Sequence, residues 1–191
     1  MRDLVVTENI TLDGVIDASE GWFSPAEDGD VDQSDVIAAL REQSEAADAV
    51  LFGRVTFEEM RGYWPHQGDD TTGIRDHLDR VAKYVVSSTL VDPKWQNTTV
   101  LGGDLLNEIR RLKSAPGRDI VTTGSITLVH CLVAAGLVDE YRLFVHPVVL
   151  GRGRRLFTDA DVPDLELVQT RPFRSGVVLL RYRTRLEKHF G

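Results

Sequence analysis

The sequence has very little of the chemistry that builds disulfide frameworks or metal centres. It holds one cysteine, Cys131, in 191 residues, so neither an intrachain disulfide nor a cysteine-based metal site can form. Cys131 lies in an apolar helical pattern, where we expect a buried thiol. No two of the five histidines have the H-x-x-x-H spacing that places two imidazoles on one helix face. We therefore expect no metal site.

Long apolar runs and a surplus of positive charge are missing too. The apolar stretch near the N-terminus is interrupted by Asp3, Thr7 and Glu8, which leaves it too short for a signal-peptide core or a membrane span. The 22 basic and 30 acidic residues give a formal net charge of −8, which argues against nucleic acid or an anionic membrane as a partner. We expect a cytoplasmic protein.

Three common site motifs are also missing. No G-x-G-x-x-G fingerprint follows the first expected strand, and no G-x-x-x-x-G-K-[ST] loop occurs, which argues against a standard Rossmann site and a P-loop NTPase. The G-x-S-x-G nucleophile elbow is missing as well, so an α/β-hydrolase is not indicated.

The sequence does contain a regular alternation of strand and helix patterns. The expected strands are residues 4–7, 49–52, 84–88, 98–101, 119–123, 140–151, 165–173 and 177–186, and the expected helices begin near residues 34, 56, 74, 104 and 125. Several of these strands are short, uninterrupted apolar runs, which are typical of strands covered on both faces. The alternation predicts one domain over residues 1–191, with a mainly parallel sheet and a terminal antiparallel hairpin.

Local signals predict where some of these elements begin and end. Thr56 and Glu59 have the spacing of a capping box, so we expect Thr56 to start a helix. Ser34 or Asp35 is expected to cap the first helix. Pro147 cannot donate a ladder hydrogen bond, which predicts an edge position or a bulge for the strand that contains it.

Three expected strand exits share one pattern of small and hydroxylic residues. They are FGRVT at 52–56, VSST at 86–89 and TTGS at 122–125. Parallel strands present their carboxyl ends at one edge of a sheet, where backbone N–H groups and helix N-termini bind phosphate. Arg54 adds a permanent positive charge. Each exit alone is also compatible with an ordinary turn, but the three together favour a dinucleotide site.

At this point the chain resembles a known family. The segments LDG, GRVT, GLVDE and PVVLGRG occur in the order found in dihydrofolate reductase-like proteins that share the reductase domain of the bifunctional riboflavin biosynthesis deaminase-reductase. The resemblance covers nearly the whole chain. It implies a three-layer α/β fold with a mixed, mainly parallel eight-stranded sheet, helices on both faces and a C-terminal β-hairpin. This agrees with the count of elements read from the residues.

The resemblance implies an NADPH-dependent reductase that transfers hydride to a small, heterocyclic substrate. That substrate would be pterin-like, or a ribosylaminopyrimidine phosphate if the chain has the 5-amino-6-(5-phosphoribosylamino)uracil reductase activity of riboflavin biosynthesis. Carried over by position, the cofactor-binding residues are Gly53, Arg54 and Thr56 at the phosphates, Ser87 and Ser88 near the 2′-phosphate, and Gly124 and Ser125 at the diphosphate. Thr123 departs from the family, which commonly has glycine there.

On the substrate side, the resemblance places Asp13 near the nicotinamide as the candidate catalytic residue, although Asp-Gly is also a common turn. Trp22 and Trp64 are candidates for stacking on a heterocycle, and their alternative role is to cover the core. His146 is a candidate substrate contact or a strand histidine with its own partner. Arg152 is a candidate phosphate ligand, a solvated loop residue or a dimer contact.

Two alternatives to a reductase stay open at this stage. A nucleotide-binding or regulatory module could have kept the cleft and lost turnover, and an interaction protein could have an incidental cleft. In each case the last two strands, which carry arginines beside the apolar residues 177–180, are expected to form a homodimer edge.

Overall fold

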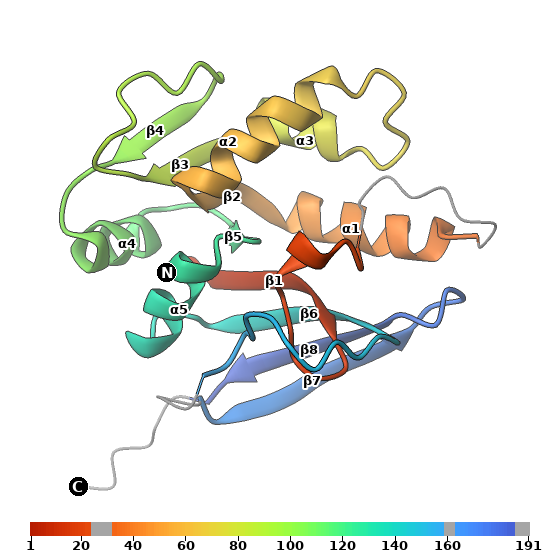
Figure 1. Ribbon diagram of the computed structural model, residues 1–191. Coiled ribbons are helices and arrows are strands. Elements are labelled where there is room, and N and C mark those ends of the chain that lie inside the picture. The colour runs from red at the N-terminus through yellow and green to blue at the C-terminus, as the bar shows by residue number, and fades with distance from the viewer. Residues whose placement is uncertain (24–31, 159–162, 186–191) are drawn as a thin grey trace, which may run out of the picture.

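The computed structural model, shown in Figure 1, describes residues 1–23, 32–158 and 163–185. Its strands are β1 (Leu4–Thr11), β2 (Ala47–Gly53), β3 (Ala82–Val86), β4 (Thr98–Leu101), β5 (Asp119–Thr122), β6 (Glu140–His146), β7 (Leu165–Pro172) and β8 (Val178–Thr184). Its α-helices are α1 (Ser34–Ala46), α2 (Arg54–Tyr63), α3 (Ile74–Arg80), α4 (Leu105–Ser114) and α5 (Ile126–Ala134). Two 3₁₀ turns, η1 (Ala18–Glu20) and η2 (Trp64–His66), complete the described elements.

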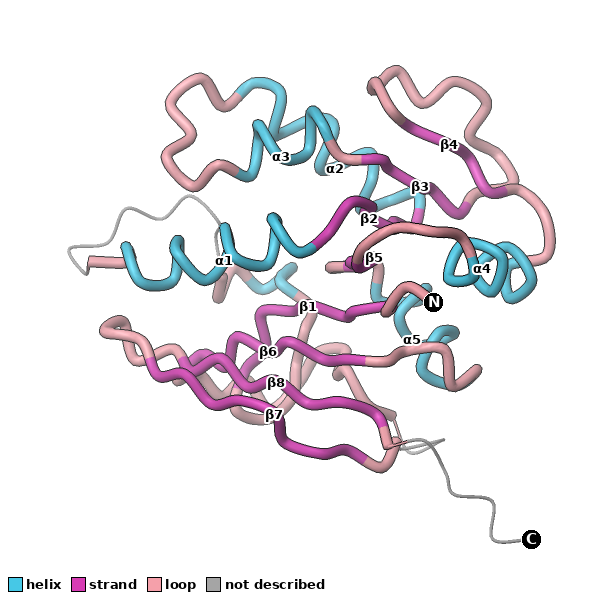
Figure 2. The backbone as a smooth tube through the Cα atoms, turned by 180° about the vertical axis from the view of Figure 1, so that it is seen from behind, coloured by secondary structure: helices cyan, strands magenta, loops and turns pink. Residues whose placement is uncertain are grey.

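The described strands form one eight-stranded sheet in the order β4-β3-β2-β5-β1-β6-β8-β7. The six strands from β4 to β6 in this order run parallel, and β8 and β7 add an antiparallel hairpin at one edge. The tube in Figure 2 shows the same order from behind, with β4 and β7 at the two ends. The predicted fold class is confirmed.

Helices cover both faces of the sheet and enclose separate apolar clusters. One face packs against α4 and α5, whose Ile109, Leu128 and Val129 join Val6 and Leu51 of the sheet in the largest cluster. The opposite face packs against α1 at β6 and β8, and against α2 and α3 at β2 and β3. In Figure 1, α4 and α5 lie to the left of the sheet and α1 to the right. The strand exits therefore lie between two helical layers.

The prediction that Pro147 marks an edge strand or a bulge is wrong. β6 lies inside the sheet between β1 and β8, and it ends at His146, one residue before the proline. Pro147 thus stops the strand and removes no ladder bond from within it. The predicted hairpin is confirmed, with Phe173 donating its backbone N–H to the Val177 carbonyl at 2.9 Å. β7 exposes Leu167 and Val168, and the homodimer expected along this hairpin stays a prediction.

Three further local predictions are wrong. α2 begins at Arg54 with Gly53 as its N-cap, so Thr56 does not cap it. α1 begins at Ser34 itself, and the Asp35 carboxylate bonds Arg174 of the hairpin at 3.3 Å. Cys131 is exposed, because it lies on the side of α5 that faces away from the sheet. Among the described residues no helix is long and apolar enough to cross a membrane.

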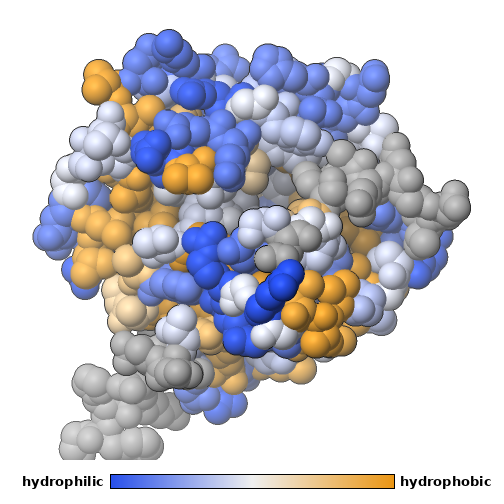
Figure 3. All heavy atoms as spheres, viewed as in Figure 1, coloured by the Kyte–Doolittle hydropathy of each residue, from blue (hydrophilic) through white to orange (hydrophobic). Residues whose placement is uncertain are grey.

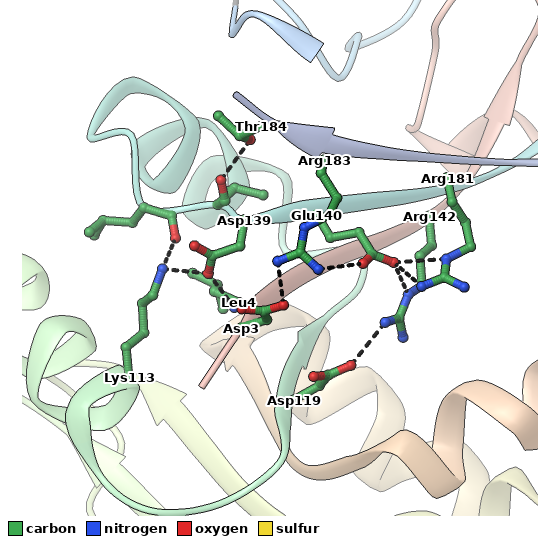
Figure 4. Close-up of polar contacts among 12 residues, drawn as sticks. Asp3, Leu4, Lys113, Asp119, Asp139, Glu140, Arg142, Arg181, Arg183 and Thr184 are labelled. Atoms are coloured by element: carbon green, nitrogen blue, oxygen red, sulfur yellow. Dashed lines mark hydrogen bonds and ion pairs between the residues drawn. The ribbon is translucent and has the colours of Figure 1, made fainter. Parts of the chain in front are cut away.

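A buried ion cluster joins β6 to the hairpin at the edge of the sheet opposite the strand exits. Figure 4 shows the Glu140 carboxylate surrounded by guanidinium groups from β6 and β8. Its side chain is 3% exposed and lies 2.6 Å from Arg142 Nε, 2.8 Å from Arg181 Nη2 and 3.6 Å from Arg183 Nη1. Arg142 also pairs with Asp119 of β5 at 2.9 Å. The cluster thereby connects three strands, β5, β6 and β8.

We predict that Glu140→Ala lowers the free energy of unfolding by about 3 kcal/mol, because it leaves the buried Arg142 and the partly exposed Arg181 and Arg183 without their shared carboxylate. Urea unfolding followed by circular dichroism measures the change. Glu166→Ala is the matched control, since Glu166 is 66% exposed and lies 3.9 Å from Arg185, and it should cost less than about 1 kcal/mol. Equal losses in the two variants would contradict a structural role for the cluster.

Candidate functional site

The three strand exits predicted to share one edge of the sheet do so. β3, β2 and β5 are neighbours and parallel, with Gly53 opposite Val86 and Leu51 opposite Thr122. The turns that follow therefore lie in a row. Two of them lead directly into helices, α2 after β2 and α5 after β5, so the unpaired N–H groups of two helix starts gather at this edge.

Two reciprocal hydrogen bonds join these helix starts. The backbone N–H of Gly53 donates to Ser125 Oγ at 3.0 Å, and the backbone N–H of Ser125 donates to Thr56 Oγ1 at 2.8 Å. Ser125 has a φ of 47°, in the left-handed region that side chains rarely adopt, and it is 9% exposed. The bonds hold this conformation and explain why Thr56 is not a cap.

The two glycines of the site differ in why they are glycines. Gly124 has a φ of 58°, and a Cβ built there would lie 3.1 Å from Thr56 Cγ2, so conformation and packing both require glycine. Gly53 has a φ of −76°, and a Cβ there would make only ordinary contacts, the nearest at 3.7 Å from Ser125. Packing within the chain does not require a glycine at position 53.

The other predicted cofactor residues lie at the same edge but are more exposed. Arg54 Nη1 pairs with Glu58 Oε2 at 2.8 Å, and the arginine side chain is 46% exposed. Ser87 Oγ accepts from the backbone N–H of Leu90 at 2.9 Å, which shapes the turn after β3. Ser88 is exposed in that turn. These side chains offer hydroxyl groups and one guanidinium next to the buried pair of helix starts.

Asp13, the predicted catalytic residue, connects two loops. Its carboxylate accepts from Thr11 Oγ1 at 2.6 Å and from the backbone N–H groups of Gly151 at 2.7 Å and Leu150 at 3.3 Å. The Thr11 hydroxyl is the largest cause, with the Gly151 N–H next, of a pKa lowered to about 2. Asp13 is ionised at neutral pH and has no proton to donate. Its contacts make it a residue that positions the loop around Gly151.

His146 lies in a small aromatic cluster where β1 and β6 end. Its Nε2 lies 2.9 Å from Asn9 Oδ1, and its ring makes edge contacts with Trp22 at 5.4 Å and Phe23 at 5.5 Å. Burial lowers the pKa of His146, so its ring is neutral at neutral pH. The structure thus brings together two of the predicted substrate contacts, Trp22 and His146.

Trp64 and Arg152 lie elsewhere. Trp64 is 6% exposed and packs with Phe57 and Leu78 under α2 and α3, so the prediction that it contacts substrate is wrong. The aromatic ring fills the core because the chain turns into η2 at this point. Arg152 is exposed in the loop between Gly151 and Gly153, near the end of β1 that Asp13 follows.

One buried group at this edge was missed by sequence reasoning. Glu8 of β1 is 4% exposed, and its Oε1 has no hydrogen-bond partner in the described structure. Burial raises its pKa well above the ordinary value, and a hydrogen bond from the Gly124 backbone acts in the opposite direction. The sequence signal was its alternation with Val6 and Ile10, which places a carboxyl at an inward-facing position.

The edge as a whole suits an anionic ligand. Within the described residues, no group of three or more histidine, cysteine, aspartate or glutamate side chains could hold a metal ion. Two adjacent helix starts instead present backbone N–H groups and the positive ends of two helix dipoles. Figure 3 shows this side of the molecule with hydrophilic atoms over α2 and α3 and apolar patches towards α4 and α5.

Comparison with curated proteins finds two relatives of similar length. The chain is 34% identical over 187 residues to the uncharacterized protein YyaP of Bacillus subtilis (strain 168), which covers 95% of this chain and 94% of that protein. It is 27% identical over 183 residues to the uncharacterized protein YwjB of the same organism, with coverage of 93% and 96%. Both relatives are named as uncharacterized proteins.

Solved structures with the same fold are also found. A Shewanella sp. PV-4 protein named for riboflavin biosynthesis superposes with a TM-score of 0.70 at 19% identity, covering 96% of this chain and 99% of that one. A pyrimidine reductase-like protein of Corynebacterium diphtheriae has a TM-score of 0.64 at 16% identity, and the superposition covers 97% of this chain and 93% of that one. The deaminase/5-amino-6-(5-phosphoribosylamino)uracil reductase of Thermotoga maritima has a TM-score of 0.63 at 16% identity, and the superposition covers 96% of this chain and 57% of that one.

These structures confirm the predicted dihydrofolate reductase-like fold. The comparison with protein families identifies the family as well as the fold, because residues 2–179 match the RibD C-terminal domain. The chain therefore belongs to the RibD C-terminal domain family, a family of reductases.

Proposed function

We propose that this chain is an NADPH-dependent reductase that transfers hydride to a small heterocyclic substrate. The observation that carries the proposal is the pair of helix starts held side by side by Gly53, Thr56 and Ser125 at the edge of the sheet. This is the arrangement that a dinucleotide diphosphate requires: N–H donors, helix dipoles and little side-chain bulk.

The residues at this edge fit NADPH. Gly124 and Ser125 would hold the diphosphate at the start of α5, and Gly53 would allow close approach at the start of α2, where packing within the chain leaves the glycine unexplained. Arg54 and the hydroxyls of Ser87 and Ser88 would hold the 2′-phosphate, because a guanidinium and neutral donors suit a phosphate dianion. When bound, NADPH supplies the hydride.

The substrate side is proposed at the loops that follow β1 and β6. Trp22, Phe23 and the neutral ring of His146 offer an apolar aromatic surface for a planar heterocycle. Asp13 fixes the loop that carries Arg152, and this arginine is our candidate for a phosphate on the substrate. A ribosylaminopyrimidine phosphate, the kind of substrate named for the Thermotoga maritima protein, has both parts.

Removal of the Arg54 guanidinium tests the cofactor. Arg54→Ala should weaken NADPH binding by about tenfold or more and NADH binding by less than twofold, because only NADPH carries the 2′-phosphate that the guanidinium would meet. Fluorescence titration measures both affinities. Arg110→Ala, at an exposed position on α4, is the control and should change neither. Failure of the wild type to bind NADPH at millimolar concentration would remove the proposal.

Turnover separates an enzyme from a binding module. NADPH oxidation measured at 340 nm against pterins, ribosylaminopyrimidines and quinones should be observed with at least one member of the panel. Binding of NADPH without oxidation by any of them would favour the module that has lost its reaction.

The contrast between the two glycines provides a separate test of the diphosphate site. Gly53→Ala should lower the free energy of unfolding by no more than about 1 kcal/mol, as for a poorer N-cap, yet weaken NADPH binding because the new methyl group enters the phosphate site. Gly124→Ala should cost about 2 kcal/mol or more, because φ is 58° and Thr56 is close. Urea unfolding and NADPH titration of both variants measure this. Unchanged NADPH affinity in Gly53→Ala would place the diphosphate elsewhere.

The lowered pKa of Asp13 predicts how the stability of the fold depends on pH. Its pKa is lowered to about 2 in the fold, so its stabilising contribution is present above the unfolded pKa of about 4 and is lost as the pH falls from about 4 to 2. The melting temperature of Asp13→Asn should therefore fall less steeply than that of the wild type over this range. Asp69→Asn, at an exposed loop position, should keep the wild-type slope. If the reaction rate of the wild type changed with pH between pH 5 and 8 and Asp13→Asn removed that change, Asp13 would instead be a residue that transfers a proton.

A further inference from the structure

Glu8 is the acidic residue of β1, and its carboxyl is buried between the sheet and the helices near the strand exits. Its residue is 4% exposed, and one of its oxygens, Oε1, has no hydrogen-bond partner in the described structure. Buried polar atoms in proteins nearly always have partners, and the exceptions gather at functional sites. A carboxyl in this state calls for a reason beyond stability, since an apolar residue would pack there without the desolvation cost.

The register of the sheet places Glu8 beside the proposed diphosphate turn. Val6 pairs with Thr122, the last residue of β5, so Glu8, two residues further along β1, lies level with the turn that follows. The Gly124 backbone hydrogen-bonds to the carboxyl. Strand alternation puts Glu8 on the face covered by α5, together with Val6 and Ile10.

Among the described residues, no charged group is a cause of the pKa shift of Glu8. On this face, Val6 and Ile10 flank it along β1, Leu143 is its partner on β6, and Leu128 and Val129 of α5 pack over the same cluster. Thr122, which pairs with Val6 of β1, also has a buried Oγ1 without a partner in the described part of the chain. Burial is the largest cause of the raised pKa of Glu8, and the Gly124 backbone is the opposing one. Ionised Glu8 would therefore be an uncompensated anion next to the turn.

We propose that Glu8 is a positioning residue for the cofactor diphosphate, and that the protonated carboxyl admits the diphosphate at the Gly124–Ser125 turn while the ionised carboxylate weakens its binding. The inference rests on the proposed function, since it needs an anionic cofactor at this turn. The physical cause is repulsion between like charges across a dry part of the protein. By linkage, binding of the cofactor raises the proton affinity of Glu8, so NADPH binding takes up a proton over the range in which free Glu8 is ionised.

The first arm of the test compares NADPH affinity from pH 6 to pH 9 in the wild type and in Glu8→Gln. Glutamine keeps the shape and an oxygen for the Gly124 N–H but carries no charge. The wild-type dissociation constant should rise by about tenfold or more with pH relative to that of the variant, as expected for one like charge near the diphosphate. Glu45→Gln, at an exposed position on α1, is the matched control and should follow the wild type.

Other groups titrate in or near this range, so the difference between wild type and Glu8→Gln is the diagnostic quantity. Burial lowers the pKa of Lys83 on β3 to about 8, and burial also lowers that of His146. The 2′-phosphate of NADPH titrates as well. All of these are shared by the two proteins and cancel in the ratio of their dissociation constants at each pH.

A second arm counts protons in both proteins. Calorimetric titration with NADPH in buffers of different ionisation enthalpy measures the number of protons exchanged, and the wild type should take up more than Glu8→Gln at the pH where the wild-type affinity falls. Parallel affinity profiles of wild type and Glu8→Gln, with equal proton uptake in the two proteins, would overturn the Glu8 proposal and leave the reductase proposal standing. A wild type that fails to bind NADPH at any pH would remove both.

Discussion

The site depends on two hydrogen bonds that cross between chain segments far apart in sequence. Gly53 and Thr56 at the start of α2 bond Ser125 at the start of α5, so residues separated by about 70 positions form one unit. Ser125 is the N-cap of α5 and has a left-handed conformation in place of the extended one that is usual at an N-cap, and this conformation is costly for a residue with a side chain. The arrangement of the two helix dipoles follows from this local constraint. A ligand at this edge would therefore contact two helix N-termini whose relative position is fixed.

The two buried carboxyls of neighbouring strands show how surroundings decide a side chain's role. Glu140 of β6 is 2% exposed but touches three guanidinium groups, so its charge is balanced and it joins strands. Glu8 of β1 is equally enclosed and has no such partner, so burial favours its neutral form. The first lies at the amino end of β6 and the second towards the carboxyl end of β1. A buried carboxyl is balanced by arginines where it joins strands, and burial favours its neutral form where the strands approach the candidate site.

Much of the fold was predictable because it follows from short-range patterns. Apolar runs, the alternation of periods and the glycine-containing exits predict the parallel sheet, the hairpin and the shared edge. The errors concern side chains whose role is set by distant residues. Thr56 has the spacing of a cap but is recruited by Ser125, and Trp64 has the exposure of a core residue because η2 turns it under α2 and α3. In the sequence, only the alternation of residues along the strand indicated that Glu8 faces inward. A carboxylate normally interrupts such an apolar pattern.

The acidic composition of the chain is compatible with the anionic cofactor that we propose for this edge. Its formal net charge of −8 acts over the whole surface, but at physiological ionic strength charges further apart than about 8 Å are largely screened. Backbone N–H groups at two helix starts act at hydrogen-bond distance and escape that screening. Two carboxyl groups at this edge are paired or neutral: Glu58 pairs with Arg54, and burial favours protonated Glu8. Local geometry, held by the bonds to Ser125, therefore decides what this edge can bind, and the overall charge does not.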